Sequence, residues 1–268
     1  MGTARLPDNG ELELGPVKLP AGERIGADEA GAPVAWVTTQ EVPDAGMVWL
    51  ALTELHAQTG LVPILLADDE GSSGYFFDQP ADVADVDRLD ADQVLAALWK
   101  YKMPDEESDQ LEGGRLSASH APFSQQFPGL APPADATPAT PERRRALSMV
   151  PAARVGLVAA QRPADVLPIV GWTTFDEFYE PVPVSNATWI AAILRSWEDR
   201  FAATLLNVGP RTQIRLLVRR PPQTPEAAQR IAAEHYAFAD GCGDGQLRDI
   251  SGIASRLVNA PIWTFWWD

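Results

Sequence analysis

The side chains best suited to chemistry lie in the second half of the chain. Glu198 and Arg200 stand two residues apart in a helical pattern, and Glu234 directly precedes His235. A carboxylate and an imidazole brought together by folding are groups of general acid–base catalysis, which suits a hydrolase or transferase using Glu198, Glu234 and His235. Because neighbours on an α-helix point about 100° apart, Glu234 and His235 are not automatically partners.

The same part of the chain also favours a binding site without catalysis. Tryptophan and arginine are enriched at binding hot spots, and six of the nine tryptophans lie in this half. Adjacent strand residues point to opposite faces, so the terminal tryptophans cannot both enter one core. We expect a groove that involves Trp172, Arg200, His235 and one of Trp266 and Trp267. The full set of candidate binding residues is Trp172, Glu198, Arg200, Glu234, His235, Trp266 and Trp267.

A structural alternative exists for the charged residues of the first of these helices. Glu198 and Asp199 follow Arg195 by three and four residues, a spacing typical of ion pairs on a solvated helix face. In that case neither acid serves a ligand.

Motifs for metals, cofactors and nucleophiles are absent from the sequence. The histidines His56, His120 and His235 are far apart and no paired Cys/His spacing occurs, so we predict no metal site and no cofactor. There is no Gly-x-Ser-x-Gly elbow. Cys242, the single cysteine, has an acid two residues away on each side, and these charges oppose thiolate formation.

Charge and hydropathy restrict the partners. Residues 1–130 contain 23 acidic and 7 basic residues, so the whole excess of −16 lies there, which argues against nucleic acid. No apolar run approaches the roughly 20 residues of a membrane span. The start of the sequence has no hydrophobic segment typical of a secretory signal, and a single cysteine fits a reducing cytoplasm. We therefore expect a cytoplasmic protein whose partner is another protein or a small molecule.

Three function classes follow. The leading hypothesis is a non-enzymatic binding or interaction protein, because no complete catalytic set is evident. The first alternative is the hydrolase or transferase described above. The second is a toxin-neutralising protein whose acidic surface covers a basic target.

The elements that position these residues follow from hydrophobic periodicity. Residues 186–203 and 225–238 are predicted helices, and residues 204–208 and 213–219 a predicted hairpin. The aromatic segment 261–268 is predicted to be the last strand of a packed sheet, since exposure would leave a large apolar patch. Asp44, Asp90 and Thr224 are predicted helix caps.

The order of elements predicts an α+β protein with a mixed or antiparallel sheet packed by two or three helices. A smaller acidic α/β module precedes it. The predicted boundaries are residues 1–130 for the acidic module, 131–148 for a Pro/Ala-rich linker and 149–268 for the carboxyl-terminal domain.

Several short motifs of the second half occur together. They are Arg162-Pro163-Ala164-Asp165, Gly171-Trp172, Arg195-Ser196-Trp197-Glu198-Asp199-Arg200-Phe201, Ala233-Glu234-His235 and Phe265-Trp266-Trp267-Asp268. This set resembles a bacterial family, common in actinobacteria, known as a domain of unknown function (DUF4253), best over residues 150–268. The resemblance implies no activity, ligand or catalytic residue. The chain departs from the family after the Glu-His helix, where Phe238-Ala239-Asp240-Gly241-Cys242 replaces an expected Phe-Cys-Pro-Asp.

Overall fold

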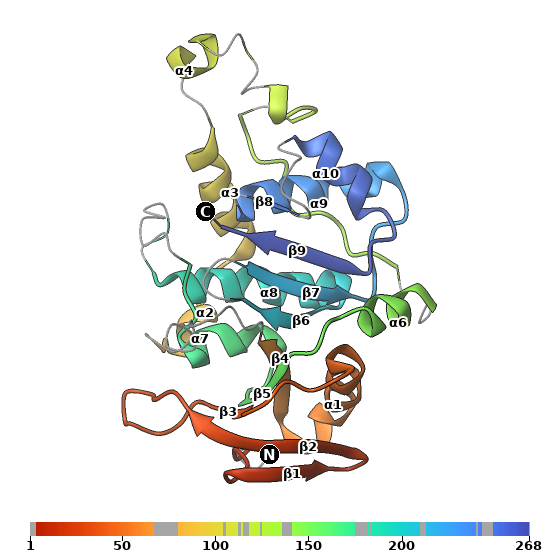
Figure 1. Cartoon of the computed structure of the whole chain (residues 1–268). Helices are drawn as coiled ribbons and strands as arrows, with labels where there is room; N and C mark the ends of the chain where they lie inside the picture. The colour runs from red at the N-terminus through yellow and green to blue at the C-terminus, as the bar shows by residue number, and fades with distance from the viewer. Residues whose placement is uncertain are drawn as a thin grey trace.

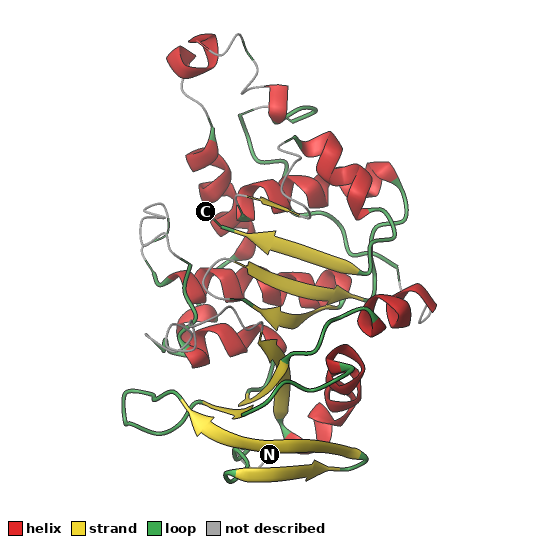
Figure 2. Cartoon of the chain, viewed as in Figure 1, coloured by secondary structure: helices red, strands yellow, loops and turns green. Residues whose placement is uncertain are grey.

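A single mixed sheet with helices on both faces organises the molecule (Figures 1 and 2). The computed structural model describes residues 4–66, 80–103, 106–111, 114, 118–123, 125–135, 141–174, 182, 184–209, 213–239, 241–242 and 249–267. Its strands are β1 (Gly10–Leu14), β2 (Val17–Ile25), β3 (Ala35–Thr38), β4 (Leu61–Leu66), β5 (Arg154–Ala159), β6 (Ala203–Val208), β7 (Gln213–Val218), β8 (Gly241–Cys242) and β9 (Ile262–Trp266). The predicted α+β class is confirmed.

Helices connect most of these strands. They are α1 (Ala45–Thr59), α2 (Val83–Val86), α3 (Ala91–Lys102), α4 (Glu106–Leu111), α6 (Pro141–Ser148), the 3₁₀ helix η1 (Pro163–Asp165), α7 (Val166–Val170), α8 (Asn186–Phe201), α9 (Pro225–Phe238) and α10 (Ile250–Leu257). The apolar stripe predicted for α8 is buried along its whole length.

The strand order is β1-β2-β3-β5-β4-β6-β7-β9-β8. β4 and β6 run parallel, with Leu65 opposite Asn207, and the other described pairs are antiparallel. The first predicted region supplies β4, and the second supplies both of its neighbours, β5 and β6. The two predicted regions therefore share one sheet.

The segment predicted as a linker, residues 131–148, is anchored in the parts that the structure describes. Ala131 is buried, and the N–H of Ala134 donates to the carbonyl of Arg200 at 3.2 Å. Residues 141–148 form α6, which begins with a proline at a favoured first position and buries Leu147. Residues 136–140 lie outside the described residues. Proline content alone did not reveal these contacts.

Two hydrophobic cores lie on the two faces of the sheet. Helices α3, α7, α8, α9 and α10 cover one face and contribute to the larger core. Helices α1 and α6 cover part of the other face, against β2, β3 and β4. In Figure 1, α1 and α6 lie in front of the sheet, and α8 and α9 lie behind it.

Local signals placed most helix starts correctly. Asp90 accepts hydrogen bonds from the N–H groups of Asp92 and Gln93, and Thr224 accepts one from Ala227, as predicted. Asp44 was predicted to cap α1, but it has φ 52° and makes no side-chain cap bond. Its left-handed backbone turns the side chain away from the orphan N–H groups of the first turn.

The aromatic terminal segment is interior sheet material, as predicted. β9 lies between β7 and β8, and Trp263 and Phe265 are buried under α8 and α9. The burial of Trp267, at 1% exposure, fixes the chain just beyond the strand.

Candidate functional site

A network of buried hydrogen bonds connects α8 and α9 with the segment around Ala131. Both terminal nitrogens of Arg200 donate to the carboxylate of Glu234, at 2.8 and 2.6 Å. Trp197 Nε1 and the N–H of Ala131 donate to the same carboxylate, each at 2.7 Å. Arg200 also donates to Ser196 Oγ and to the carbonyl of Ala131. Glu234 is 0% exposed, so Arg200 and Glu234 form a buried, hydrogen-bonded ion pair within the core.

His235 lies beside this pair in an aromatic environment. Its ring centroid is 5.1 Å from that of Trp197 and 4.6 Å from those of Trp263 and Phe265. Burial, with the charge of Arg200 nearby, lowers the pKa of His235 to about 3. An imidazole with such a pKa is a weak base at neutral pH.

Glu198 has partners that the sequence did not indicate. Arg162 Nε donates to its Oε2 at 2.9 Å, and the N–H of Ala164 donates to its Oε1 at 2.6 Å. Burial raises the pKa of Glu198 to about 7, while the bonds from Arg162 and Ala164 oppose that rise. Glu198 is thus held against η1, and Glu234 against Arg200.

The expected pairing of Arg195 with Glu198 and Asp199 is replaced by a crossed arrangement. Arg195 Nε donates to Asp165 at 2.6 Å, and Arg195 also pairs with Asp87. Arg162 spans Glu198 and Asp199 instead. The cause is tertiary packing, because η1 contacts α8. Arg162, just before η1, therefore meets the acids of α8, and Asp165 meets Arg195.

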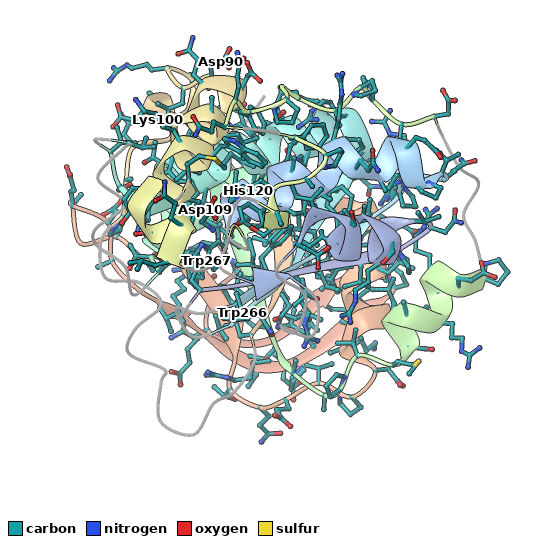
Figure 3. The ribbon with its side chains drawn as sticks, turned by 90° about the horizontal axis from the view of Figure 1, so that it is seen from above. Asp90, Lys100, Asp109, His120, Trp266 and Trp267 are labelled. Carbon is teal, nitrogen blue, oxygen red and sulfur yellow. The ribbon has the colours of Figure 1, made fainter. Side chains whose placement is uncertain are left out.

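The tryptophans of the predicted groove lie in the core. Trp172 is 0% exposed, donates from Nε1 to the carbonyl of Gly209 at 3.0 Å, and packs its ring 5.7 Å from that of Trp267. Trp267 donates to the carbonyl of Phe238 at 3.3 Å. With His235 also buried, these side chains do not line an open groove. Figure 3 labels Trp267 together with its neighbour Trp266.

Trp266 occupies the other face, as the strand alternation predicts. It is half-buried and stands opposite Gly241 of β8. A Cβ added at Gly241 would lie 1.8 Å from Cε2 of Trp266, so the indole lies directly over the glycine. Trp266 therefore covers the short edge strand.

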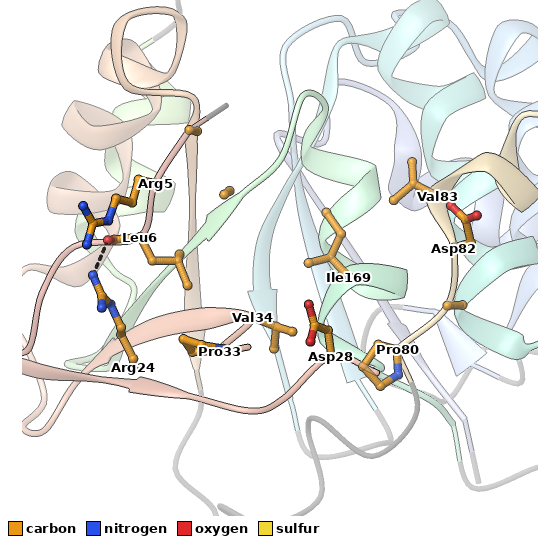
Figure 4. Close-up of a pocket in the computed structure, with 13 residues that line it drawn as sticks. Arg5, Leu6, Arg24, Asp28, Pro33, Val34, Pro80, Asp82, Val83 and Ile169 are labelled. Carbon is orange, nitrogen blue, oxygen red and sulfur yellow. Dashed lines mark hydrogen bonds between the residues drawn. The ribbon is translucent and has the colours of Figure 1, made fainter. Parts of the chain in front are cut away.

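A feature that sequence reasoning missed is an open cleft of about 710 Å³, which we call the charged cleft (Figure 4). Arg5 precedes β1 and Arg24 lies in β2. Asp28 lies in the loop after β2, and Asp82 precedes α2. Leu6, Val34, Val83 and Ile169 supply apolar surface between these charges. No sequence periodicity links these segments, so only the fold brings them together.

Two of these charged residues also fix the local backbone. Arg24 donates to the carbonyls of Pro7 and Leu6, at 2.7 and 2.9 Å, and so holds the segment before β1. Asp28 accepts from the N–H groups of Ala30 and Ala32 and shapes the loop after β2. The cleft walls are therefore held in place by hydrogen bonds.

Metal binding and membrane crossing gain no support from the described part of the chain. Within it, no three His, Cys, Asp or Glu side chains are grouped so as to hold a metal ion. Nor does any described helix combine the length and apolar character of a membrane span.

The structure is α+β, and the motif residues Trp172, Trp197, Glu234 and His235 are buried in its core. Residues 154–268 match the family model described as Domain of unknown function (DUF4253), which confirms the resemblance seen in the motifs. No curated protein and no solved structure matches the chain. The matched range contains the Arg200–Glu234 pair and the crossed pairs of η1 and α8. Arg5, Arg24, Asp28 and Asp82 precede it.

Proposed function

We propose that this protein is a non-enzymatic binding protein whose ligand site is the charged cleft. The observation that supports this most is the composition of the cleft, with charges of both signs around an apolar surface. Ligand sites combine apolar walls with a few placed polar groups and have volumes of about 300–1,000 Å³. The cleft, at about 710 Å³, lies within that range.

The arrangement of the acid–base candidates favours binding over catalysis. Glu234 has four hydrogen bonds from protein groups. His235 is 1% exposed and neutral at physiological pH. A hydrolase or transferase would need these groups within reach of a substrate, directly or through one water.

The proposed setting is the cytoplasm, and the proposed partner is a small molecule or a protein segment. The acidic first half opposes a polyanionic ligand such as nucleic acid. The same acidity supports the toxin-neutralising alternative, in which a basic protein covers the exposed acids Glu11 and Glu13 of β1. Co-purification with a basic protein that shields β1 would favour that alternative.

Obstruction of the cleft tests the proposal. Val83 lines the cleft and Ala84, its exposed neighbour on α2, does not. A library of small polar compounds and short peptides is screened against the full chain by ligand-observed NMR. Compounds that bind wild type are expected to lose at least about ten-fold in affinity with Val83→Trp, since the indole occupies part of the site, and to bind Ala84→Trp normally.

Two results would contradict this function. One is a set of ligands that bind Val83→Trp and wild type equally. The other is chemical conversion of a ligand by the wild type that is abolished in Glu198→Gln. Circular dichroism of each variant checks that the fold is retained.

A further inference from the structure

Charge is segregated within the charged cleft. Arg5 and Arg24 lie together at one end, and Asp28 and Asp82 lie toward the other, with Pro33 and Val34 between the arginines and Asp28 and with Ile169 beside Asp28 (Figure 4). The cations come from the segment before β1 and from β2, while the acids belong to the loop after β2 and the start of α2. The cleft therefore presents opposite charges to the two ends of a ligand.

Arg24 is already paired, because its Nη2 donates to Asp8 Oδ1 at 2.6 Å, so Arg5 is the more exposed of the two cations. The side chain of Arg5 is 84% exposed, and its nearest acid, Asp8, is 4.0 Å away. Asp82 uses Oδ1 to accept the N–H of Ala84. Asp28 likewise uses Oδ1 for its two loop bonds. One oxygen of each carboxylate makes these bonds, and both residues line the cleft.

We propose that the charged cleft binds a zwitterionic peptide, and this inference rests on the proposed function. The peptide carboxylate lies at Arg5, next to the paired Arg24, and an ammonium or guanidinium group lies at Asp28 and Asp82. Apolar side chains of the peptide cover Ile169 and the residues beside it. Opposite charges at both ends give the ligand a fixed direction in the cleft.

Other ligand classes leave part of the cleft unmatched. A polyanion would meet the repulsion of Asp28 and Asp82, and a simple cation that of the arginines. An uncharged apolar ligand would remove water from four charges without replacing their interactions, which is unfavourable. A molecule with a charge of each sign and an apolar middle can interact favourably with the arginines, the aspartates and the apolar residues of the cleft.

The probes are peptides of the form Lys-(Val)n-Leu with free ends, where n runs from zero to three. Each is titrated against the full chain at low salt by isothermal calorimetry and NMR. Affinity should be highest at one length, because only that length lets both ends reach their walls. Amidation of the carboxyl end should weaken binding about two- to five-fold, the range of exposed ion pairs.

Matched variants assign each end of the peptide. Arg5→Gln should weaken the free-acid peptide about two- to five-fold and leave the amidated peptide unchanged. Asp82→Asn keeps the Oδ1 atom that accepts the N–H of Ala84. This variant should bind the lysine peptide more weakly. It should bind a control peptide, with an acetylated amino end and norleucine in place of lysine, as tightly as wild type does. Asp85→Asn and Arg88→Gln, an exposed pair outside the cleft, are the charge-matched controls and should change neither.

The source of the peptide is addressed by a second arm. The best tetrapeptide is joined to the carboxyl end of a folded carrier protein and titrated again. Binding of the fusion assigns the terminal segment of a protein as ligand, and binding of the free peptide alone assigns a short soluble peptide.

Two failures can be distinguished. If no peptide of the series binds at millimolar concentration, while other compounds still lose affinity with Val83→Trp, the peptide inference is wrong and the proposed function stands. If the peptides bind but Val83→Trp, Arg5→Gln and Asp82→Asn have no effect, the peptide site is not the charged cleft and the inference is also wrong. If no compound depends on Val83, the proposed function fails with it.

Discussion

Arg162 donates from Nε to the carboxylate of Glu198 at 2.9 Å, and so joins η1 to α8. The reverse pair, Arg195 with Asp165 at 2.6 Å, joins the same two elements. The motif at η1 therefore contributes one arginine and one acid, and the motif of α8 contributes Arg195 and the two acids Glu198 and Asp199. The motifs recognise each other within the fold, which explains their composition without a ligand.

Loss of one partner in this crossed arrangement should destabilise the protein. Arg162→Met is expected to lower the free energy of unfolding by about 1.5–3 kcal/mol, the range for hydrogen bonds to charged groups. Lys18→Met removes one partner of an exposed pair with Glu13 and should cost less than about 1 kcal/mol. Urea denaturation measures both variants. Equal effects would contradict a structural role for Arg162.

Glu198 should make stability fall as pH rises. Its folded pKa of about 7 lies above the ordinary value of 4.5, so its contribution is complete below pH 4.5 and is lost as the pH rises through 7. Between these values the slope is about −1.4 kcal/mol per pH unit. Glu198→Gln should remove it. Urea unfolding of both proteins at several pH values tests this, and identical slopes would contradict it.

His235 should act in the opposite direction. Its folded pKa of about 3 lies below the ordinary 6.5, so its contribution is complete above pH 6.5 and is lost as the pH falls toward 3. His235→Leu should therefore flatten the loss of stability between pH 6 and 4 by about 1.4 kcal/mol per pH unit. The two effects overlap near pH 5–6, so each variant is compared with wild type at the same pH. A slope unchanged in His235→Leu would mean that the ring titrates normally in the fold.

Gly241 and Trp266 should be thermodynamically coupled. Gly241→Ala places a methyl group where the indole lies, and overpacking of this kind costs about 1–3 kcal/mol. In a Trp266→Ala background the same change should be nearly neutral, because the obstruction is gone. Thermal unfolding of the four proteins measures the coupling. A cost of Gly241→Ala that is the same in both backgrounds would contradict the observed contact.

Local pattern was enough to predict α8, the cap at Thr224 and the interior strand that contains Phe265, because periodicity and capping depend on neighbouring residues. The partners of Glu234 were not predictable in this way. Arg200 is 34 residues away and Ala131 is 103 residues away, and a helical pattern does not specify which helix it faces. The adjacent Glu234 and His235 suggested acid–base chemistry, whereas the structure buries both side chains in the core.

The charged cleft was even harder to predict from the sequence. Its charges come from segments that read as irregular or as a helix cap, and each of Arg24, Asp28 and Asp82 has a local backbone role. Their convergence depends on tertiary packing, in which α2 and α7 both contact α8, and hydrophobic spacing does not determine that packing.

We infer that Arg200 and Glu234 act to stabilise the core. A double-mutant cycle on the free energy of unfolding, with Arg200→Met, Glu234→Gln and the double variant, tests it most directly. Each single change leaves a buried group uncompensated and should cost about 3–5 kcal/mol. The double variant should cost no more than either single change, which gives a coupling of at least about 3 kcal/mol. Single changes that cost under about 1 kcal/mol and add independently would contradict the claim.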